Sequence, residues 1–223
     1  HLVGACHLDL LFVWPYRESV RKNLRTNLIA ADLMSRHKDY RFGQTQAKLF
    51  ADMKRYHPRE FARVKALVRR GRFEPLGDMW MEPDANIPSG EALVRQILYG
   101  RKFFEKEFAT RSTICWWSDV FGVTASLPQI LVQAGFRLYY SAKHSVWHDT
   151  NEFPYGTFWW EGIDGTRIMT HFPPTHFIGK MDPESLLLQW NLYQQKDEAP
   201  HVMYTYGFGD GGDRKSPLFI WGQ

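Results

Sequence analysis

Residues 2–36, LVGACHLDLLFVWPYRESVRKNLRTNLIAADLMSR, contain the pattern that decides the fold. The short apolar run over 2–6 predicts a buried strand that ends at the polar residues His7 and Asp9. Apolar residues then recur at helical spacing over 16–36, which predicts an amphipathic helix. The stretch therefore predicts a strand, a loop and a helix, with two polar side chains at the carboxyl end of the strand.

The same unit of strand and helix recurs along the chain. Further strands are expected over 40–45, 73–80, 113–117 and 137–141, and further helices over 46–70, 90–108 and 125–134. Gly71 stands where the C-cap of the second helix is expected. Strands that alternate with long helices imply right-handed parallel crossovers, in either a barrel or an open doubly wound sheet.

The pattern changes in the last third of the chain. Strands over 157–160 and 167–172 flank the sequence GIDG at 162–165, which indicates a hairpin. A helix over 183–195 and a strand over 202–206 are expected after it. The whole chain is thus expected to form one α/β domain that ends in a mixed segment.

Bulk properties narrow the classes of protein. The chain has 223 residues, 44% of them hydrophobic, which suits a single large α/β domain. Lys and Arg exceed Asp and Glu by 28 − 24 = 4, but the basic residues are scattered over helical segments. Solvated helix faces explain this charge better than a nucleic-acid partner does. No apolar run of about 18 residues occurs, so no membrane partner is expected.

The chain ends and the cysteines add two expectations. The chain opens inside a strand-like segment with no charged leader, so its start is expected to be truncated. Cys6 and Cys115 each lie in an apolar run that predicts a buried strand, so no disulfide framework is expected. A reducing compartment, the cytoplasm, is the expected location.

The pair His7 and Asp9 offers an imidazole and a carboxylate two residues apart. On an extended strand end both side chains point to the same side and can share one cation. Nitrogen and oxygen ligands suit zinc, which takes about four ligands and keeps one position open in catalytic sites. The alternative is that both side chains bond only to loop backbone.

Two further carboxylates follow predicted strands. Asp119 ends the apolar stretch Trp116-Trp117-Ser118 and is the best third ligand, although an N-cap would also explain it. Asp210 lies among the glycines of 207–212, where a ligand site and a plain turn are both compatible with the pattern. No Gly-Lys-Ser/Thr follows, so nucleotide binding is discounted. Aromatic residues beside acids, such as Trp80, suit sugars, but core packing explains them too.

A resemblance covers nearly the whole chain. It is carried by these ordered motifs: Cys6-His7-Leu8-Asp9, Trp14-Pro15-Tyr16, Glu18-Ser19-Val20-Arg21-Lys22, Gly71-Arg72-Phe73-Glu74-Pro75, Glu82-Pro83-Asp84, Pro88-Ser89-Gly90-Glu91, Asp119-Val120-Phe121-Gly122, Phe158-Trp159-Trp160-Glu161-Gly162 and Thr170-His171-Phe172-Pro173-Pro174. In these motifs the chain resembles glycoside hydrolase family 38 α-mannosidases, especially the cytosolic and vacuolar type.

The resemblance implies a fold and a metal. It implies an α/β fold, a (β/α)7-barrel-like glycoside hydrolase domain that is incomplete, with residues 1–223 as an N-terminal catalytic domain truncated at both ends. One zinc ion would be held by His7, Asp9, Asp119 and a more distant histidine, with another divalent ion such as Co²⁺ left open. The fourth ligand is expected beyond Gln223.

The resemblance also implies a reaction. Asp119 would be the nucleophile of a retaining hydrolysis of terminal α-mannosides in mannose-containing oligosaccharides. Asp210 is the candidate acid/base, since its predicted strand should reach the same face, and Asp84 and Glu161 compete for the role. A homo-oligomer is left open.

Other residues are expected to contact the substrate. Phe12, Trp80, Asp84 and Lys143 are the substrate-binding candidates. The family usually has Trp where this chain has Phe12, so the stacking platform is smaller and has no N–H donor. Lys143 matches the basic residue that the family has after the fifth strand. His171 is expected near the site, whereas the remaining histidines, His176 among them, are expected to be structural or on the surface.

Two rivals stand beside this interpretation. A zinc-dependent carbohydrate deacetylase would need further clustered histidines. The second rival is a truncated or diverged carbohydrate-binding protein without activity. It is considered because Asp213-Arg214-Lys215-Ser216 interrupts the glycine string that is usual in the family.

Overall fold

The computed structural model describes residues 1–146, 153–207 and 209–210. The predicted interruption over 213–216 and the end of the glycine-rich stretch lie outside the described residues. The elements in chain order are β1 (Leu2–Cys6), α1 (Tyr16–Arg36), β2 (Phe42–Gln44), α2 (Ala47–Tyr56), α3 (Pro58–Arg69), β3 (Phe73–Pro75), α4 (Gly90–Phe108), β4 (Ile114–Trp117), α5 (Leu127–Gln133), β5 (Leu138–Ser141), α6 (Lys143–Val146), β6 (Thr157–Glu161), β7 (Arg167–His171), α7 (Pro183–Leu192) and β8 (Tyr204–Tyr206).

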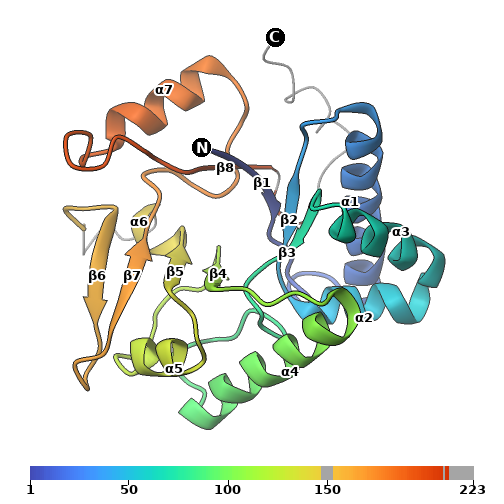
Figure 1. The fold of residues 1–223 in the computed structure, drawn as a ribbon, viewed down its shortest axis with the longest axis horizontal. Coiled ribbons are helices and arrows are strands. Elements are labelled where there is room, and N and C mark those ends of the chain that lie inside the picture. Colours follow the sequence, from blue (N-terminus) through green and yellow to red (C-terminus); the bar gives the residue numbers. More distant parts are fainter. Residues whose placement is uncertain (147–152, 208, 211–223) are drawn as a thin grey trace.

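The described strands form two sheets of four strands each (Figure 1). The first has the order β3-β2-β1-β8, and all its pairs are parallel. The second has the order β4-β5-β7-β6, in which only the β6 and β7 hairpin is antiparallel. The predictions of parallel crossovers and of a hairpin are therefore confirmed, while closure into a (β/α)7 barrel stays a prediction.

Two predicted elements differ most from the structure. Smaller differences are that the helix over 183–195 ends at Leu192, the strand over 202–206 begins at Tyr204, and α6 was not predicted. The single helix over 46–70 is wrong, because the chain forms α2 and α3, and Pro58 begins the second. Proline has no N–H for the helix ladder, and its ring clashes with the preceding turn. The strand over 73–80 is also too long, since β3 ends at Pro75 and Asp78 adopts a positive φ of 48° in the loop that follows. Gly71, with φ 63°, does end α3 as predicted.

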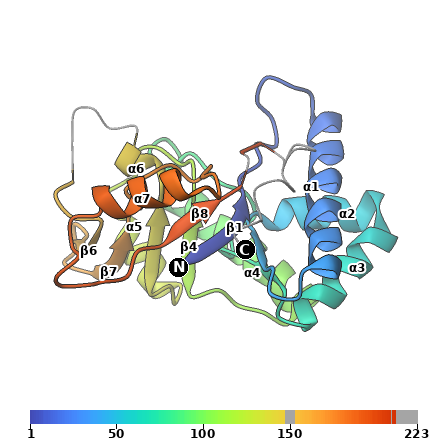
Figure 2. The same ribbon diagram turned by 90° about the horizontal axis from the view of Figure 1, so that it is seen from above.

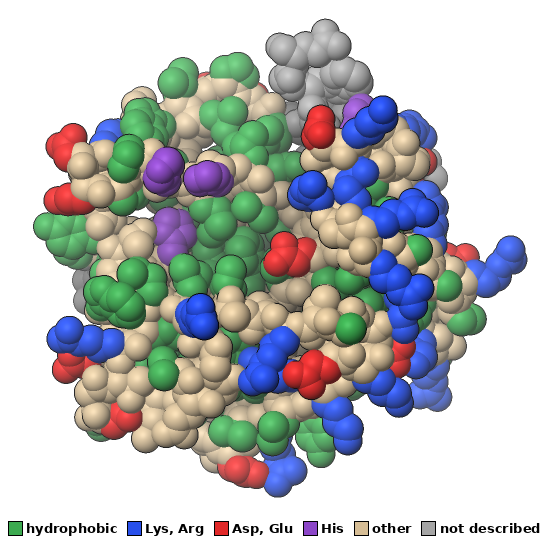
Figure 3. Space-filling view, viewed as in Figure 1, with side chains coloured by type: hydrophobic (Ala, Val, Ile, Leu, Met, Phe, Trp, Pro, Cys, Tyr) green, Lys and Arg blue, Asp and Glu red, His purple; other side chains and the backbone are tan. Residues whose placement is uncertain are grey.

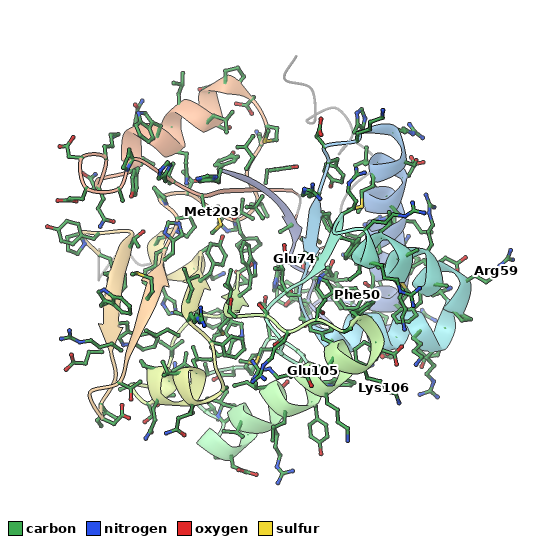
Figure 4. The ribbon with its side chains drawn as sticks, in the orientation of Figure 1. Phe50, Arg59, Glu74, Glu105, Lys106 and Met203 are labelled. Atoms are coloured by element: carbon green, nitrogen blue, oxygen red, sulfur yellow. The ribbon has the colours of Figure 1, made fainter. Side chains whose placement is uncertain are left out.

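Helices cover the outer faces of both sheets. Figures 1 and 2 show α1, α2 and α3 beside the first sheet. In Figure 1, α5 lies below the second sheet and α4 runs along the bottom between α5 and α2. Phe50 of α2 is buried and contacts Phe73 of β3 and Phe104 of α4 at ring centroid distances of 6.0 and 5.5 Å (Figure 4). Edge-to-face aromatic packing of this kind fixes how the helices sit on the sheet.

The joint between the sheets lies where β3 leads to β4. Asp78 Oδ2 accepts hydrogen bonds from Arg101 Nε of α4 at 3.0 Å and from the Ser112 backbone N–H at 2.9 Å. Gly77, with φ 80°, lies against the backbone of Trp116, where a Cβ atom would come within 3.3 Å of its nitrogen and oxygen. A buried ion pair and a close backbone approach thus connect the end of the first sheet to the start of the second.

A cavity of about 960 Å³ opens between the sheets at the amino-terminal halves of their strands. Its lining includes Leu2, Phe42 and Ile114, the first residues of β1, β2 and β4, together with Leu76 and Tyr206. The lining contains none of His7, Asp9, Asp119 and Asp210. Figure 3 shows apolar side chains in this hollow and Lys and Arg side chains gathered on the helical side. Cys6 and Cys115 are both buried, and no disulfide joins these two described residues. None of the described helices has the length and apolar character needed to cross a membrane.

Candidate active site

Five charged side chains gather just past the carboxyl ends of four strands. His7 and Asp9 follow β1, Asp119 follows β4, Lys143 follows β5 and Asp210 follows β8. Parallel strands bring their carboxyl ends to one face, which is where such folds build sites. The structure therefore brings together residues that are up to 203 positions apart, from His7 to Asp210.

The two ring nitrogens of His7 face different partners. Nε2 lies 3.3 Å from Asp9 Oδ1 and 3.7 Å from Asp119 Oδ2. Nδ1 lies 3.1 Å from Oε2 of Glu82, on the loop after β3. The ring is 5% exposed and packs edge-on against Phe177 at a centroid distance of 5.4 Å. His7 is thus the centre of the cluster, with one nitrogen directed to Asp9 and Asp119.

The spacing of these atoms suits a zinc ion. Ligands of a tetrahedral zinc ion with bonds of about 2.0–2.2 Å lie roughly 3.3–3.6 Å apart, close to the distances from Nε2 to Asp9 and Asp119. His7, Asp9 and Asp210 each offer one ligand atom, and these three atoms lie within 4.8 Å of one another. A set of one nitrogen and several oxygens matches the ligands that zinc accepts. The group within reach of one ion is therefore His7, Asp9 and Asp210, whereas Asp119, the predicted third ligand, is linked to it by its 3.7 Å approach to His7 Nε2. The chemistry of these residues fits zinc, and the predicted role of Asp119 as a ligand stays a prediction.

The charges in the cluster favour a cation. The pKa of His7 is raised well above its usual value: burial works against the charged ring, but the negative charges of Glu82 and Asp9 outweigh it. The hydrogen bond from His7 lowers the pKa of Asp9, against the effect of burial. Without a metal the imidazole thus holds a proton among carboxylates. A metal ion that displaces this proton would satisfy the same negative charges.

Asp210 differs from the other carboxylates. Its Oδ1 accepts a hydrogen bond from the Asp9 backbone N–H at 3.3 Å, and Lys22 Nζ bonds to its backbone oxygen at 3.3 Å. Burial raises the pKa of Asp210, and the charge of Asp9 acts in the same direction, whereas the N–H bond, His7 and Lys22 oppose it. A carboxyl group with a raised pKa suits proton donation. It lies beside Asp9 and His7, close enough to be a ligand as well.

Asp119 is held by a cation. Lys143 Nζ donates a hydrogen bond to its Oδ1 at 2.7 Å, which leaves Oδ2 on the side of His7. The Lys143 ammonium also lies 5.4 Å from the centroid of the Phe121 ring. Lys143 was predicted to bind substrate, and the structure places it against the candidate nucleophile.

The aromatic candidates lie in two different settings. Phe12 is 67% exposed on the loop after β1 and meets Trp14 edge-on at 5.7 Å. Trp80 is partly buried against the first core cluster, and its ring lies 6.2 Å from that of Phe103 on α4. Phe12 is therefore free to meet a ligand, whereas the contacts of Trp80 are those of a packing residue. Both roles in substrate binding remain predictions.

The competitors for the acid/base role have partners of their own. Asp84 accepts the backbone N–H groups of Asn86 and Ile87 at 2.8 and 2.9 Å, and these bonds lower its pKa. Glu161 is 51% exposed on the hairpin and accepts a bond from Arg167 Nε at 2.6 Å. A carboxylate kept ionised by a turn, or paired on the surface, is a poor proton donor.

Three residues near the site were not predicted in these places. Glu82 stood in a quoted motif, but only the fold shows that it meets His7. His176 was expected on the surface or in a structural role. Burial lowers its pKa, while the charge of Asp119 raises it, so it lies within electrostatic reach of the site. Phe177, which packs on His7, had no signal in the sequence at all.

His171 lies deeper in the second sheet than expected. Its Nδ1 shares a hydrogen bond with Thr157 Oγ1 at 2.8 Å, and its ring stacks on Tyr140. Burial lowers its pKa to about 4, so the ring stays neutral at physiological pH. No described contact links it to His7 or Asp119.

Known proteins resemble this chain in sequence. The chain matches the glycosyl hydrolases family 38 N-terminal domain over residues 1–218. It is 40% identical to human alpha-mannosidase 2C1 over 213 residues and 39% identical to an alpha-mannosidase of Saccharomyces cerevisiae over 212 residues. These matches cover 95% and 94% of the chain but 20% of each relative, so the chain spans about a fifth of the length of these relatives.

A solved structure agrees with the fold. The crystal structure of an alpha-mannosidase from Enterococcus faecalis V583 superposes with a TM-score of 0.79 over 98% of this chain and 26% of that one, at 19% identity. The α/β arrangement with parallel sheets is thus shared. From the match over residues 1–218 and the ordered motifs that carry it, the chain belongs to glycosyl hydrolase family 38.

Proposed function

We propose that the domain forms the zinc-binding and nucleophile-bearing part of a retaining α-mannosidase that acts on terminal mannose of oligosaccharides. The observation that supports this most is the placement of His7 Nε2 between Asp9 and Asp119, at 3.3 and 3.7 Å. His7, Asp9 and Asp119 would hold the ion, and Asp210, which has an atom within 4.8 Å of the His7 and Asp9 ligand atoms, would stay unbound and serve as the acid. When bound, zinc would act as a Lewis acid that binds sugar hydroxyls and orients the sugar ring.

In this proposal Asp119 is the nucleophile. Its Oδ1 is fixed by Lys143, so Oδ2 has a defined position relative to the cluster. Attack on the anomeric carbon forms a glycosyl ester on Asp119 as the bond to the leaving oxygen breaks. The Lys143 ammonium orients the carboxylate and is well placed to meet a sugar hydroxyl.

Asp210 is the proposed acid/base. Burial and the charge of Asp9 raise the pKa of Asp210, which favours its protonated form. This form can give a proton to the leaving oxygen, and the ionised form can then take a proton from water. Asp84 and Glu161 are weaker candidates because a turn and an arginine already bind their carboxylates. Phe12 is proposed as the platform for the sugar face.

The rival functions have less support. A deacetylase with a histidine-rich metal site is disfavoured, because the metal cluster found among the described residues contains one histidine, His7. A carbohydrate-binding protein without activity would keep the same geometry and differ only in turnover. A cytoplasmic location stays a prediction, supported by two buried cysteines that are not joined in a disulfide.

The acid/base role is tested by changing the leaving group. In the active protein that contains this domain, Asp210→Ala should slow unactivated mannosides strongly, because their leaving oxygen needs a proton. Activated aryl mannosides should keep their first step, and added azide should restore the second. Equal loss on both substrate types, with no azide effect, would contradict the proposal and pass the role to Asp84 or Glu161.

The metal role is tested on the 223-residue chain. Titration with zinc against a chromophoric indicator should show binding that His7→Ala weakens by roughly 100-fold or more, because it removes a ligand. His201→Gln, an exposed histidine, is the matched control and should leave the affinity unchanged. Equal affinity in His7→Ala would place the zinc elsewhere.

A further inference from the structure

Glu82 is a buried carboxylate to which the mechanism above gives no part. Its side chain is 8% exposed, and Oε2 lies 3.1 Å from His7 Nδ1. Its other oxygen, Oε1, and His7 Nδ1 are both buried and make no aligned hydrogen bond among the described residues, so the contact between Nδ1 and Oε2 is an ion pair at 3.1 Å. A buried charge is costly unless it is paired, so its contact with His7 must offset that cost.

The contact with Glu82 decides which ring nitrogen of His7 faces Asp9 and Asp119. The two nitrogens of an imidazole point away from each other, so a ring that directs Nδ1 to Glu82 must direct Nε2 elsewhere. Nε2 is the atom that lies near Asp9 and Asp119. Glu82 is therefore on the opposite side of the ring from the proposed ion and is not placed to bind it.

Gln46 fixes Glu82 relative to His7. Its Oε1 accepts the Glu82 backbone N–H at 3.3 Å, and its Nε2 donates to the backbone oxygen of Leu8 at 2.9 Å. One buried side chain thus joins the loop after β3 to the residue next to His7. Gln46 itself has a φ of 67°, an unfavourable conformation for a residue with a side chain, and such strain concentrates at functional sites.

We propose that Glu82 is a positioning residue that holds His7 with Nε2 toward the metal, and that Gln46 holds Glu82 in place. This role rests on the metal site of the proposed function. A carboxylate that accepts the second N–H of a metal-bound histidine fixes its tautomer and ring orientation and raises its basicity as a ligand. Glu82 thereby acts on the ion through His7.

Zinc affinity of the 223-residue chain measures this role without any substrate. At fixed pH, competition with a chromophoric indicator should give a dissociation constant roughly 10- to 100-fold higher for Glu82→Met than for the wild type. Glu82→Gln keeps an acceptor oxygen and should lose less affinity. Glu105→Met makes the same change on an exposed residue of α4 (Figure 4) and should have no effect.

A nitrogen spectrum of the ring separates positioning from general damage. In the zinc-loaded wild type, long-range ¹H–¹⁵N spectra should show one form of His7, with the proton on Nδ1 and the metal on Nε2. Glu82→Met should show a mixture of forms or a shifted Nδ1 resonance. Glu82→Gln should restore the single form, which a merely structural residue would not require.

The outcomes distinguish this inference from the metal site itself. If zinc binds the wild type through His7, but Glu82→Met keeps the wild-type affinity and spectrum, the positioning role is wrong and the metal site stands. If His7→Ala binds zinc as tightly as the wild type, the metal site fails, and this role fails with it. Should Glu82→Met not fold, Gln46→Ala replaces it, with weaker binding expected and unchanged affinity and spectrum overturning the role.

Discussion

The two sheets contribute different chemistry to one site. The first sheet is parallel throughout, and its strand ends supply His7, Asp9 and Asp210. The second ends in an antiparallel hairpin and supplies Asp119, fixed by Lys143. The first sheet thus carries most of the proposed metal ligands and the second carries the proposed nucleophile. The site depends on how the sheets are joined, and each part of that comparison can be tested separately.

The largest effect is expected from the second sheet. In the active protein, Asp119→Ala should lower kcat by on the order of 10⁴-fold for activated and unactivated mannosides alike, because no covalent intermediate can form. Steady-state kinetics with both substrate types measures it. Asp39→Ala, an exposed aspartate, is the control, and a loss below about tenfold in Asp119→Ala would mean that the nucleophile lies elsewhere.

The joint between the sheets should control stability. Asp78→Ala leaves the Arg101 guanidinium, 11% exposed, without its charge partner, so the free energy of unfolding should fall by about 3–5 kcal/mol. Urea denaturation measures this change. Asp32→Ala breaks the surface pair with Arg36, in which the side chains are 46% and 67% exposed, and should cost at most about 1 kcal/mol. Similar losses in the two variants would show that the joint does not hold the sheets together.

His171 should make the second sheet sensitive to acid. Its folded pKa, about 4, lies below the usual 6.5, so the folded state binds fewer protons than the unfolded state between these values. Stability is therefore full above pH 6.5 and is lost as the pH falls toward 4, by about 2.5 kcal/mol at pH 4.5. Urea midpoints at pH 7 and 4.5 should show that His171→Leu removes most of this loss of stability on acidification. An unchanged slope would assign the acid sensitivity to other groups.

The smallest effect is expected at the rim of the first sheet. Phe12→Trp enlarges an exposed platform and adds an N–H donor, so KM for a mannoside should fall by about two- to tenfold, equivalent to roughly 0.5–1.5 kcal/mol. The value of kcat should stay the same. Leu11→Trp, on the neighbouring exposed residue, is the control, and an equal gain there would indicate unspecific stacking.

The sequence predicted most of the fold because its signals are local. The limits of β1, α1 and α4 are those of the predicted segments, since each has clear periodicity. Ser89 supplies a side-chain cap for α4, where its Oγ accepts the Ala92 N–H. The failures were also local: Pro58 divides a helix that apolar spacing alone made continuous, and the turn at Asp78 ends a strand early.

The candidate site could be predicted only in part. His7, Asp9 and Asp119 stood out because polar residues follow apolar strands, and parallel strands align their ends. Whether Asp210 would serve as acid or ligand could not be predicted, because its pKa depends on burial beside Asp9. The roles of Glu82, His176 and Phe177 depend on contacts with residues from other elements. The local sequence pattern therefore did not predict their positions near the site.

By itself the sequence determined the order of strands and helices and the chemical types gathered at the strand ends. Periodicity and turn residues act over a few positions, so they can be read along the chain. Only the tertiary structure decided that Glu82 faces Nδ1 of His7 and that Gln46 joins the two loops. These contacts link residues 36 to 75 positions apart, from Gln46 to Glu82 and from His7 to Glu82. Their distances are set by how strands and helices pack in space.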